Sequence, residues 1–105
     1  MDFKVFITDP AIEGLSRIVT EIARHNPEAA QRFGTVLLDR AESLRTFPLR
    51  GRMVPEKQKP DVREIVVRPY RIVYRVKEAE RRVDVLCFWH GSRGVPEWHE
   101  IAVKQ

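Results

Sequence analysis

The sequence predicts an α+β domain in which an antiparallel pair of helices covers one face of a sheet. The chain is short, at 105 residues, its first half contains two segments with the helical period, and its second half contains three apolar segments of strand type. A sheet with one apolar face must bury that face against another layer, and the helices are expected to supply it. The length leaves room for one domain, residues 1–105.

The N-terminal part predicts one strand and two helices. Residues 2–8 alternate in polarity, as a strand with one buried face does. Asp9-Pro10 and Asn26-Pro27 are typical helix starts, and we expect Asp9 and Asn26 to be the N-caps. Phe47-Pro48 ends the second helix, and the short link predicts a hairpin. The expected apolar stripes are Ile12, Leu15, Ile18, Val19 and Ile22, then Ala30, Phe33, Leu37, Ala41 and Leu44.

The C-terminal part predicts a three-stranded antiparallel sheet after a basic surface loop, residues 48–60. Residues 62–67 and 70–76 are expected to pair as a hairpin around Arg68-Pro69. Residues 83–90 form the last strand, which is apolar on both faces and therefore central. In the middle strand Arg71 and Arg75 point away from the aromatic side. If that aromatic side meets the helices, both arginines lie on a free, concave and basic face. The tail after Pro96 is predicted to be a short helix or an edge strand.

Positive charge is concentrated in one segment. The whole chain carries a net charge of +4, but residues 45–77 alone carry ten Lys/Arg against three Asp/Glu, a net of +7. Residues 1–44 have a net of −2 and residues 78–105 a net of −1. Such a local field attracts nucleic acid or an acidic polypeptide, and it also serves solubility, so these interpretations stay open.

Several protein classes are excluded by the composition. No apolar run approaches the roughly 20 residues of a membrane helix, and the N-terminus has no signal-peptide pattern, so we expect a soluble, cytoplasmic protein without membrane contact. Cys87 is the single cysteine and is expected to be buried and inert. Cys87, His90 and His99 fit no recognised metal site, so neither a metal nor another cofactor is predicted.

Four segments resemble, in order, the RelE/ParE superfamily of toxins from bacterial type II toxin–antitoxin modules. They are NPEAAQRF at the helical turn, LRTFPLRGRMVPE after it, VREIVV with YRIVYRV, and VLCFWHGSR at the end of the sheet. The resemblance covers nearly the whole chain. It implies a small toxic protein that a cognate antitoxin holds inactive through an acidic C-terminal segment. It also implies that operator DNA is bound only through the antitoxin.

Two mechanisms occur in that superfamily. Toxins similar to RelE and YoeB cleave mRNA on the ribosome without a metal. The resemblance assigns Glu56 as the base, Arg71 and Arg63 to the phosphate, and His90 as the acid, so ribosome-bound mRNA is the target of this alternative. ParE-like toxins instead poison DNA gyrase. Gly91-Ser92-Arg93 replaces the terminal catalytic tyrosine of the ribonucleases, and this ending, with the long helical hairpin, favours the ParE-like mechanism.

The basic residues expected to bind a target are distributed over the second half of the chain. They are Arg50, Arg52, Arg71, Arg75 and Arg93. Structural interpretations remain beside these roles: Glu56 as a loop carboxylate paired with Lys57 or Arg52, and Arg63 or Arg71 paired across strands with Glu64.

Overall fold

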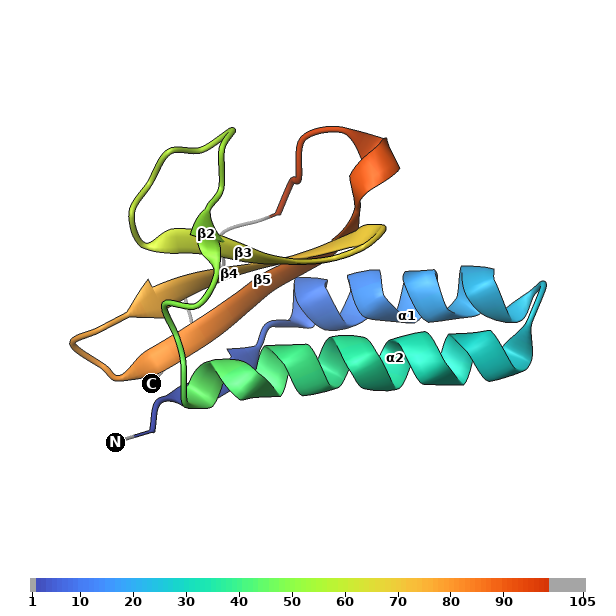
Figure 1. The fold of residues 1–105 in the computed structure, drawn as a ribbon, viewed down its shortest axis with the longest axis horizontal. Coiled ribbons are helices and arrows are strands. Elements are labelled where there is room, and N and C mark those ends of the chain that lie inside the picture. Colours follow the sequence, from blue (N-terminus) through green and yellow to red (C-terminus); the bar gives the residue numbers. More distant parts are fainter. Residues whose placement is uncertain (1, 99–105) are drawn as a thin grey trace.

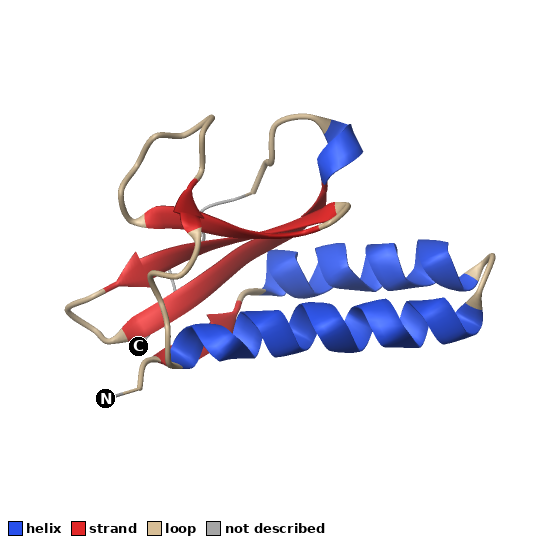
Figure 2. Ribbon diagram, viewed as in Figure 1, coloured by secondary structure: helices blue, strands red, loops and turns tan. Residues whose placement is uncertain are grey.

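Two helices pack against a five-stranded sheet in the computed structural model, which describes residues 2–98 (Figures 1 and 2). No helix in this part of the chain is long and apolar enough to cross a bilayer. The predicted C-terminal tail lies mostly outside the described residues. The elements in chain order are β1 (Lys4–Ile7), α1 (Asp9–Ala23), α2 (Pro27–Glu42), η1 (Ser43–Arg45), β2 (Arg52–Met53), β3 (Val62–Val67), β4 (Tyr70–Lys77), β5 (Arg82–His90) and η2 (Gly91–Arg93).

The sheet has the order β1-β5-β4-β3-β2. The predicted antiparallel strands β3, β4 and β5 form its centre, which confirms the α+β class. The prediction of three strands was incomplete, because β1 joins one edge and pairs with β5 in parallel. At the other edge β2 pairs with β3, so residues 48–60 are not a loop throughout. A strand of two residues has no measurable period, and for this reason the sequence did not predict it.

The helix starts differ in detail from the prediction. Asn26 caps α2 as expected, and its side chain accepts a hydrogen bond from Ala29 N at 3.0 Å. The N-cap of α1 is Thr8 rather than Asp9, which is the first helical residue. Thr8 Oγ1 also donates to Val85 O at 2.8 Å, so the same hydroxyl joins the helix start to β5. Both residue types cap helices well, and the contact with β5 favours threonine.

One large apolar core lies between the sheet and the helices. We call the sheet face that contacts α1 and α2 the helix face; its strands contribute Ile65, Tyr70, Ile72, Tyr74, Val76, Val83, Val85 and Phe88. The predicted stripe of α2 is confirmed, with Leu37, Ala41 and Leu44 fully buried. In α1 the predicted residues Leu15, Ile18 and Ile22 pack against this core, whereas Ile12 is 52% exposed and Ala11 is buried in its place.

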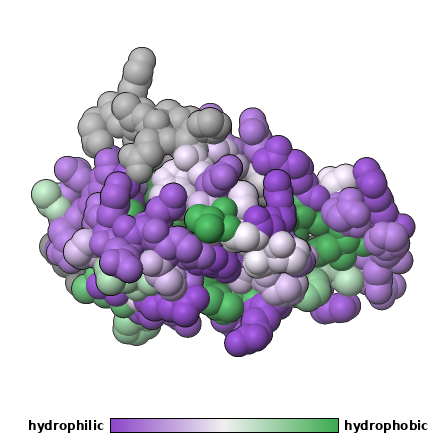
Figure 3. All heavy atoms as spheres, turned by 90° about the horizontal axis from the view of Figure 1, so that it is seen from above, coloured by the Kyte–Doolittle hydropathy of each residue, from purple (hydrophilic) through white to green (hydrophobic). Residues whose placement is uncertain are grey.

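The opposite side of the sheet, the open face, is less bare than predicted. Arg71 and Arg75 do lie on it, together with Val73. However, the loop after β2 folds over part of it and inserts Val54, which packs with Val62, Val73, Leu86 and Cys87. Seen from this side, the surface is mainly hydrophilic with separate apolar spots (Figure 3). The open face is therefore a small second core flanked by charged side chains.

A β-bulge in β5 changes which residues face which layer. Tyr74 lies opposite Val85, whereas Val73 lies opposite Cys87, so Leu86 is the extra residue. Leu86 and Cys87 both pack in the open-face cluster, while Phe88 returns to the helix-face core. Beyond the bulge, Trp89 faces the open side opposite Arg71, and His90 faces the helix side opposite Tyr70. In β5, odd-numbered residues therefore face the helices before Leu86, and even-numbered residues face them after it.

Candidate functional site

A fully buried carboxylate, Glu64, lies at the centre of the charged cluster on the open face. Arg71 Nε donates to its Oε1 at 2.5 Å, and Arg52 Nε donates to its Oε2 at 2.6 Å. Strand register explains the contact, because Arg52 is opposite Glu64 and Val66 is opposite Arg71. All of these side chains therefore leave the same face. With its two oxygens bound by two guanidinium groups, Glu64 tolerates burial in its charged form.

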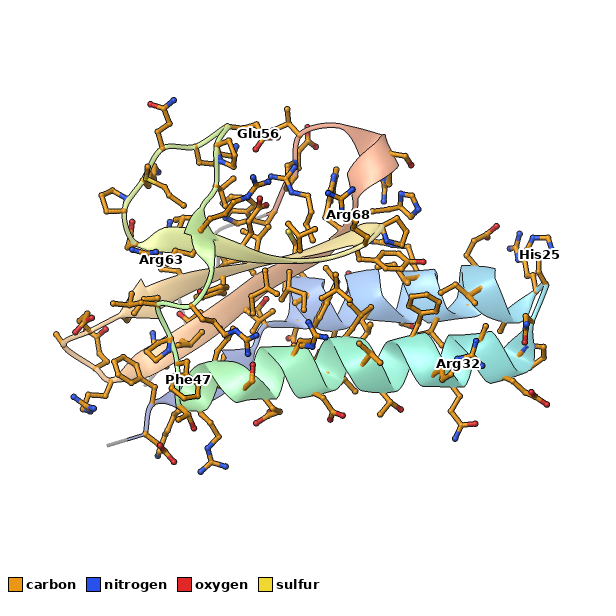
Figure 4. All side chains as sticks on the ribbon, viewed as in Figure 1. His25, Arg32, Phe47, Glu56, Arg63 and Arg68 are labelled. Carbon is orange, nitrogen blue, oxygen red and sulfur yellow. The ribbon has the colours of Figure 1, made fainter. Side chains whose placement is uncertain are left out.

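Glu56 reaches the same cluster from the loop above the sheet (Figure 4). Arg71 Nη1 and Nη2 donate to its two carboxylate oxygens at 3.0 and 2.8 Å, which is a bidentate ion pair. The hydrogen bonds from Arg71 hold the pKa of Glu56 at about 2, well below the ordinary value. In turn, Glu56 and then Glu64 raise the pKa of Arg71. Glu56 thus pairs with Arg71 and not with Lys57 or Arg52, the partners considered from the sequence.

Arg63 lies on the other side of the sheet from Arg71. It is opposite Tyr74, a residue of the helix-face core, and its Nη1 donates to Gly51 O at 2.9 Å. Its buried Nε has no hydrogen-bond acceptor among the described residues. Gly51 N also donates to the Tyr74 hydroxyl at 2.9 Å. Arg63 therefore binds the chain just before β2. The sheet lies between Arg63 and the cluster around Glu56.

His90 also points away from Glu56. Its ring contacts Tyr70 edge to face, with 5.2 Å between the ring centroids, and Tyr70 makes the same kind of contact with Phe33 of α2. His90 Nδ1 lies 2.7 Å from Ser92 Oγ and accepts a hydrogen bond from Ser92 N at 3.1 Å. This histidine thus caps η2 and borders the helix-face core. Of the four residues assigned to ribonuclease chemistry, the fold brings only Glu56 and Arg71 together.

The other predicted target-binding arginines make separate contacts. Arg50 Nη1 donates to Ser43 Oγ at 2.8 Å, on the side of α2. Arg75 forms an ion pair with Asp61 at 3.2 Å on the open face. Arg93 lies over the ring of Trp89, with 4.8 Å between the guanidinium carbon and the ring centroid. The five arginines therefore do not converge on one anion.

A groove is lined by α1 on one side and by the C-terminal end of β5 on the other. It has a volume of about 1270 Å³, and its walls include Gly14 and Arg17 from α1, Trp89 and Arg93 near the end of the sheet, and Trp98. β1 pairs with β5 only as far as Val85, so the rest of β5 borders this groove. Gly14 lets α1 approach β5 closely at one wall of the groove, because a Cβ at this position would lie only 3.2 Å from Phe88 O. The groove is large enough for a helix or an extended segment of a partner.

No cluster of three or more His, Cys, Asp or Glu side chains suited to a metal occurs within residues 2–98. His99, one of the residues weighed for a metal site, lies outside the described residues. Cys87 is buried, and burial raises the pKa of its thiol to about 12. The thiolate is therefore not populated near neutral pH, as the position of Cys87 in an apolar strand predicted.

Comparison with known proteins identifies the family. Residues 5–95 match the model of the ParE toxin of the type II toxin–antitoxin system parDE. The chain belongs to this ParE toxin family. It is also 33% identical over 95 residues to Toxin RelE1 of Caulobacter vibrioides, a match that covers 87% of this chain and 96% of that protein. Membership in the RelE/ParE superfamily, which the sequence motifs predicted, is confirmed.

Two solved structures of toxin–antitoxin systems share the fold of this ParE-family chain. The chromosomal ParDE system from P. aeruginosa matches with a TM-score of 0.70 at 20% identity, over 84% of this chain and 95% of that chain. The RelBE2 complex from Mycobacterium tuberculosis matches with a TM-score of 0.64 at 21% identity, over 86% and 99%. At these identities the likeness establishes the arrangement of helices and strands.

Glu64 is the residue of this ParE-family site to which the sequence analysis gave no functional role. It was considered only as a surface partner for Arg63 or Arg71, yet its side chain is fully buried. A signal was present, because Glu64 is a lone carboxylate in the apolar strand VREIVV. A charge in such a strand is retained only if it is paired, and the facing arginine of YRIVYRV is the residue available to pair with it.

Proposed function

We propose that this ParE-family toxin inhibits growth by poisoning DNA gyrase through binding, without a catalytic step of its own. The observation that carries the proposal is the ion-pair network of Glu56, Arg71, Glu64 and Arg52. A general base works best with a pKa near the operating pH, and Glu56 at about 2 is a weak base. Arg71 already binds two carboxylates, so little of its positive charge is left for a phosphate.

The position of His90 supports the same proposal. General acid and base must both reach one phosphate, within about 3 Å of the atoms that exchange protons. Glu56 approaches from the open face, whereas His90 packs against Tyr70 on the helix side. A cleavage mechanism would need one of them to move across the sheet edge. Binding a target needs no such movement.

A cognate antitoxin is the second proposed partner. The groove beside α1 accommodates a helix, and the open face carries exposed basic groups such as Arg52 and Arg93 that suit an acidic extended segment. The relatives from P. aeruginosa and M. tuberculosis are toxin–antitoxin systems, which supports this proposal. Co-expression with an acidic partner encoded next to the toxin gene is expected to restore growth and to give a complex that co-purifies.

The alternative is a metal-independent, ribosome-dependent mRNA endoribonuclease. One observation favours it: Glu56 and Arg71, the assigned base and phosphate ligand, are in direct contact on the accessible side of the sheet. RNA supplies the nucleophile from its own 2′-hydroxyl group, so a displaced Glu56 and a freed Arg71 would suffice to begin the reaction.

Glu56→Gln distinguishes the two mechanisms. The amide keeps the shape of the side chain but cannot act as a base. If gyrase is the target, the variant is expected to remain toxic on induction and to inhibit supercoiling within about threefold of the unmodified protein, since the changed pair is partly exposed. If the protein is a ribonuclease, the variant is expected to lose mRNA cleavage on programmed ribosomes by about 10²-fold or more.

The matched control is Glu80→Gln, which removes the same charge from the exposed turn between β4 and β5. It is expected to behave as the unmodified protein in both assays. The gyrase proposal fails if purified toxin in large molar excess changes neither supercoiling nor the amount of gyrase-dependent DNA cleavage.

A further inference from the structure

Three arginines surround a shallow hollow at the β3 edge of the sheet. This basic hollow has a volume of about 600 Å³ and is lined by Arg40 of α2, Arg52 of β2 and Arg68 of the β3–β4 turn, with Val66 and Val67 between them. Figure 4 labels Arg68 at the tip of the hairpin. No carboxylate and no aromatic ring belongs to the lining. Neither Glu56 nor Arg71 contributes to it, and Arg52 is the one residue of its lining that also belongs to the ion-pair network.

The guanidinium groups of the basic hollow are available to a ligand. Arg40 and Arg68 are exposed, and within residues 2–98 neither makes an ion pair. Arg52 uses Nε and Nη2 on a single oxygen of Glu64 and keeps 61% of its side chain exposed. By contrast, the side chain of Arg71 is only 12% exposed between its two carboxylates. The three arginines of the basic hollow are therefore less neutralised than Arg71, which is paired with two carboxylates.

We propose that the basic hollow binds the phosphate backbone of double-stranded DNA. Arginine forks match phosphate oxygens, and guanidinium groups from three separate elements suit a row of phosphates better than one small anion. A site for single-stranded nucleic acid normally offers aromatic rings on which bases stack, and this lining has none. A duplex presents its phosphate backbone outward and keeps its bases stacked inside. The arginines of the lining suit binding to that backbone alone.

An acidic peptide fits the basic hollow less well. Peptides that bind at a sheet edge add a strand and are held by a ladder of main-chain hydrogen bonds. β2 pairs with β3 as far as Glu64, and the turn at Arg68 follows β3 directly, so only residues 65–67 remain for a new strand. Three residues, of which only alternate ones face outward, give too short a ladder. The arginines must therefore be used by a ligand that needs no main-chain pairing.

The role of this contact rests on the proposed function, because gyrase holds duplex DNA. A toxin bound to gyrase through one surface would touch the enzyme's DNA with the basic hollow and so hold both together. Backbone contacts carry no base sequence, so specific operator recognition remains the task expected of the antitoxin.

The test is a titration of the purified toxin with a fluorescent DNA duplex of about 20 base pairs at several salt concentrations. Three arginine–phosphate contacts predict that log K falls with log salt at a slope of about −3. Arg40→Gln with Arg68→Gln should reduce the slope to about −1, since each arginine accounts for about one unit. Circular dichroism and thermal unfolding verify that the double variant is folded, as expected for two exposed side chains.

The matched control is Arg24→Gln with Arg32→Gln, which removes two exposed charges near the turn between α1 and α2 and should leave the slope at about −3. Equal effects of the two double variants, or no duplex binding at low salt, would overturn the proposal. If a poly-glutamate peptide binds as tightly as the duplex, and the Arg40 and Arg68 changes abolish its binding, the basic hollow would be assigned to an acidic protein instead. Gyrase is absent from the titration, so its outcome does not depend on gyrase being the target.

Discussion

The helix face and the open face of the same sheet bury their residues by different means. The helix face is closed by two amphipathic helices, and its large side chains, such as Leu37 and Tyr74, are fully buried. The open face is partly closed by a loop of irregular structure that inserts one apolar residue, Val54, and pairs an exposed carboxylate, Glu56, with Arg71. The first arrangement depends on apolar area and the second on charge pairing. We therefore expect the two faces to respond to different perturbations.

Arg63 and Arg71 illustrate the difference. They are of the same residue type on neighbouring strands, but Arg63 donates to a main-chain carbonyl at the edge of the helix-face core, and Arg71 is held by two carboxylates on the open face. A sequence pattern gives both residues the same anion-binding role. Their partners show that the charge of Arg71 is already balanced within the protein, whereas Arg63 binds the main-chain oxygen of Gly51.

Replacement of a buried leucine by alanine in each apolar core should give the largest difference in stability between the two faces. Leu37→Ala is expected to lower the free energy of unfolding by about 2–5 kcal/mol, because the rigid helices cannot close the cavity. Leu86→Ala on the open face is expected to cost about 2 kcal/mol, at the low end of that range, since the loop can settle onto the smaller side chain. Chemical denaturation of both variants measures the difference. A loss for Leu86→Ala that equals that of Leu37→Ala would show that the loop is as rigid as the helices.

Neutralisation of the buried carboxylate tests the charge pairing of the open face. Glu64→Gln is expected to lower the free energy of unfolding by about 1–3 kcal/mol, because Arg71, with 12% of its side chain exposed, loses a charged partner. Arg52→Gln, its control on the exposed side of the same carboxylate, should cost at most about 1 kcal/mol. Denaturation midpoints of both variants give the comparison. If Arg52→Gln is the more damaging of the two, Glu64 depends on the outer arginine and not on Arg71.

The smallest expected effect is the pH dependence of the loop contact. The pKa of Glu56 is about 2 in the folded protein, against an ordinary value of 4.5. A carboxyl whose pKa falls on folding stabilises the protein above its unfolded value and loses that contribution as the pH falls through its folded value. Unmodified protein should therefore be more stable than Glu56→Gln above about pH 4.5, and the difference should vanish near pH 2. Thermal unfolding across this range measures it, and a constant difference would contradict the assigned ion pair.

Much of the fold follows from residue periodicity. The boundaries of β3, the cap at Asn26 and the buried stripe of α2 agree with the sequence pattern, because each depends on neighbouring residues. The parallel pairing of β1 with β5 depends on residues far apart in the chain, and no local pattern encodes it. The choice of Thr8 over Asp9 as a cap likewise depends on the carbonyl of Val85.

The candidate site was only partly predictable for a related reason. Strand parity correctly placed Arg71 and Arg75 on the open face. It could not show that Arg71 would meet Glu56, since the loop that carries Glu56 has no period. It also could not place His90, because the run from Val85 to Trp89 is apolar on both faces and conceals the extra residue at Leu86.

The bulge at Leu86 gives β5 one residue more than β4 between Val85 and His90. In a regular strand, a one-residue change in register moves every later side chain to the other face. In β5, deletion of one residue from the stretch 86–89 would instead remove the bulge and leave His90 opposite Tyr70, on the helix side. The face on which His90 lies is therefore insensitive to the loss of one residue from this part of the strand.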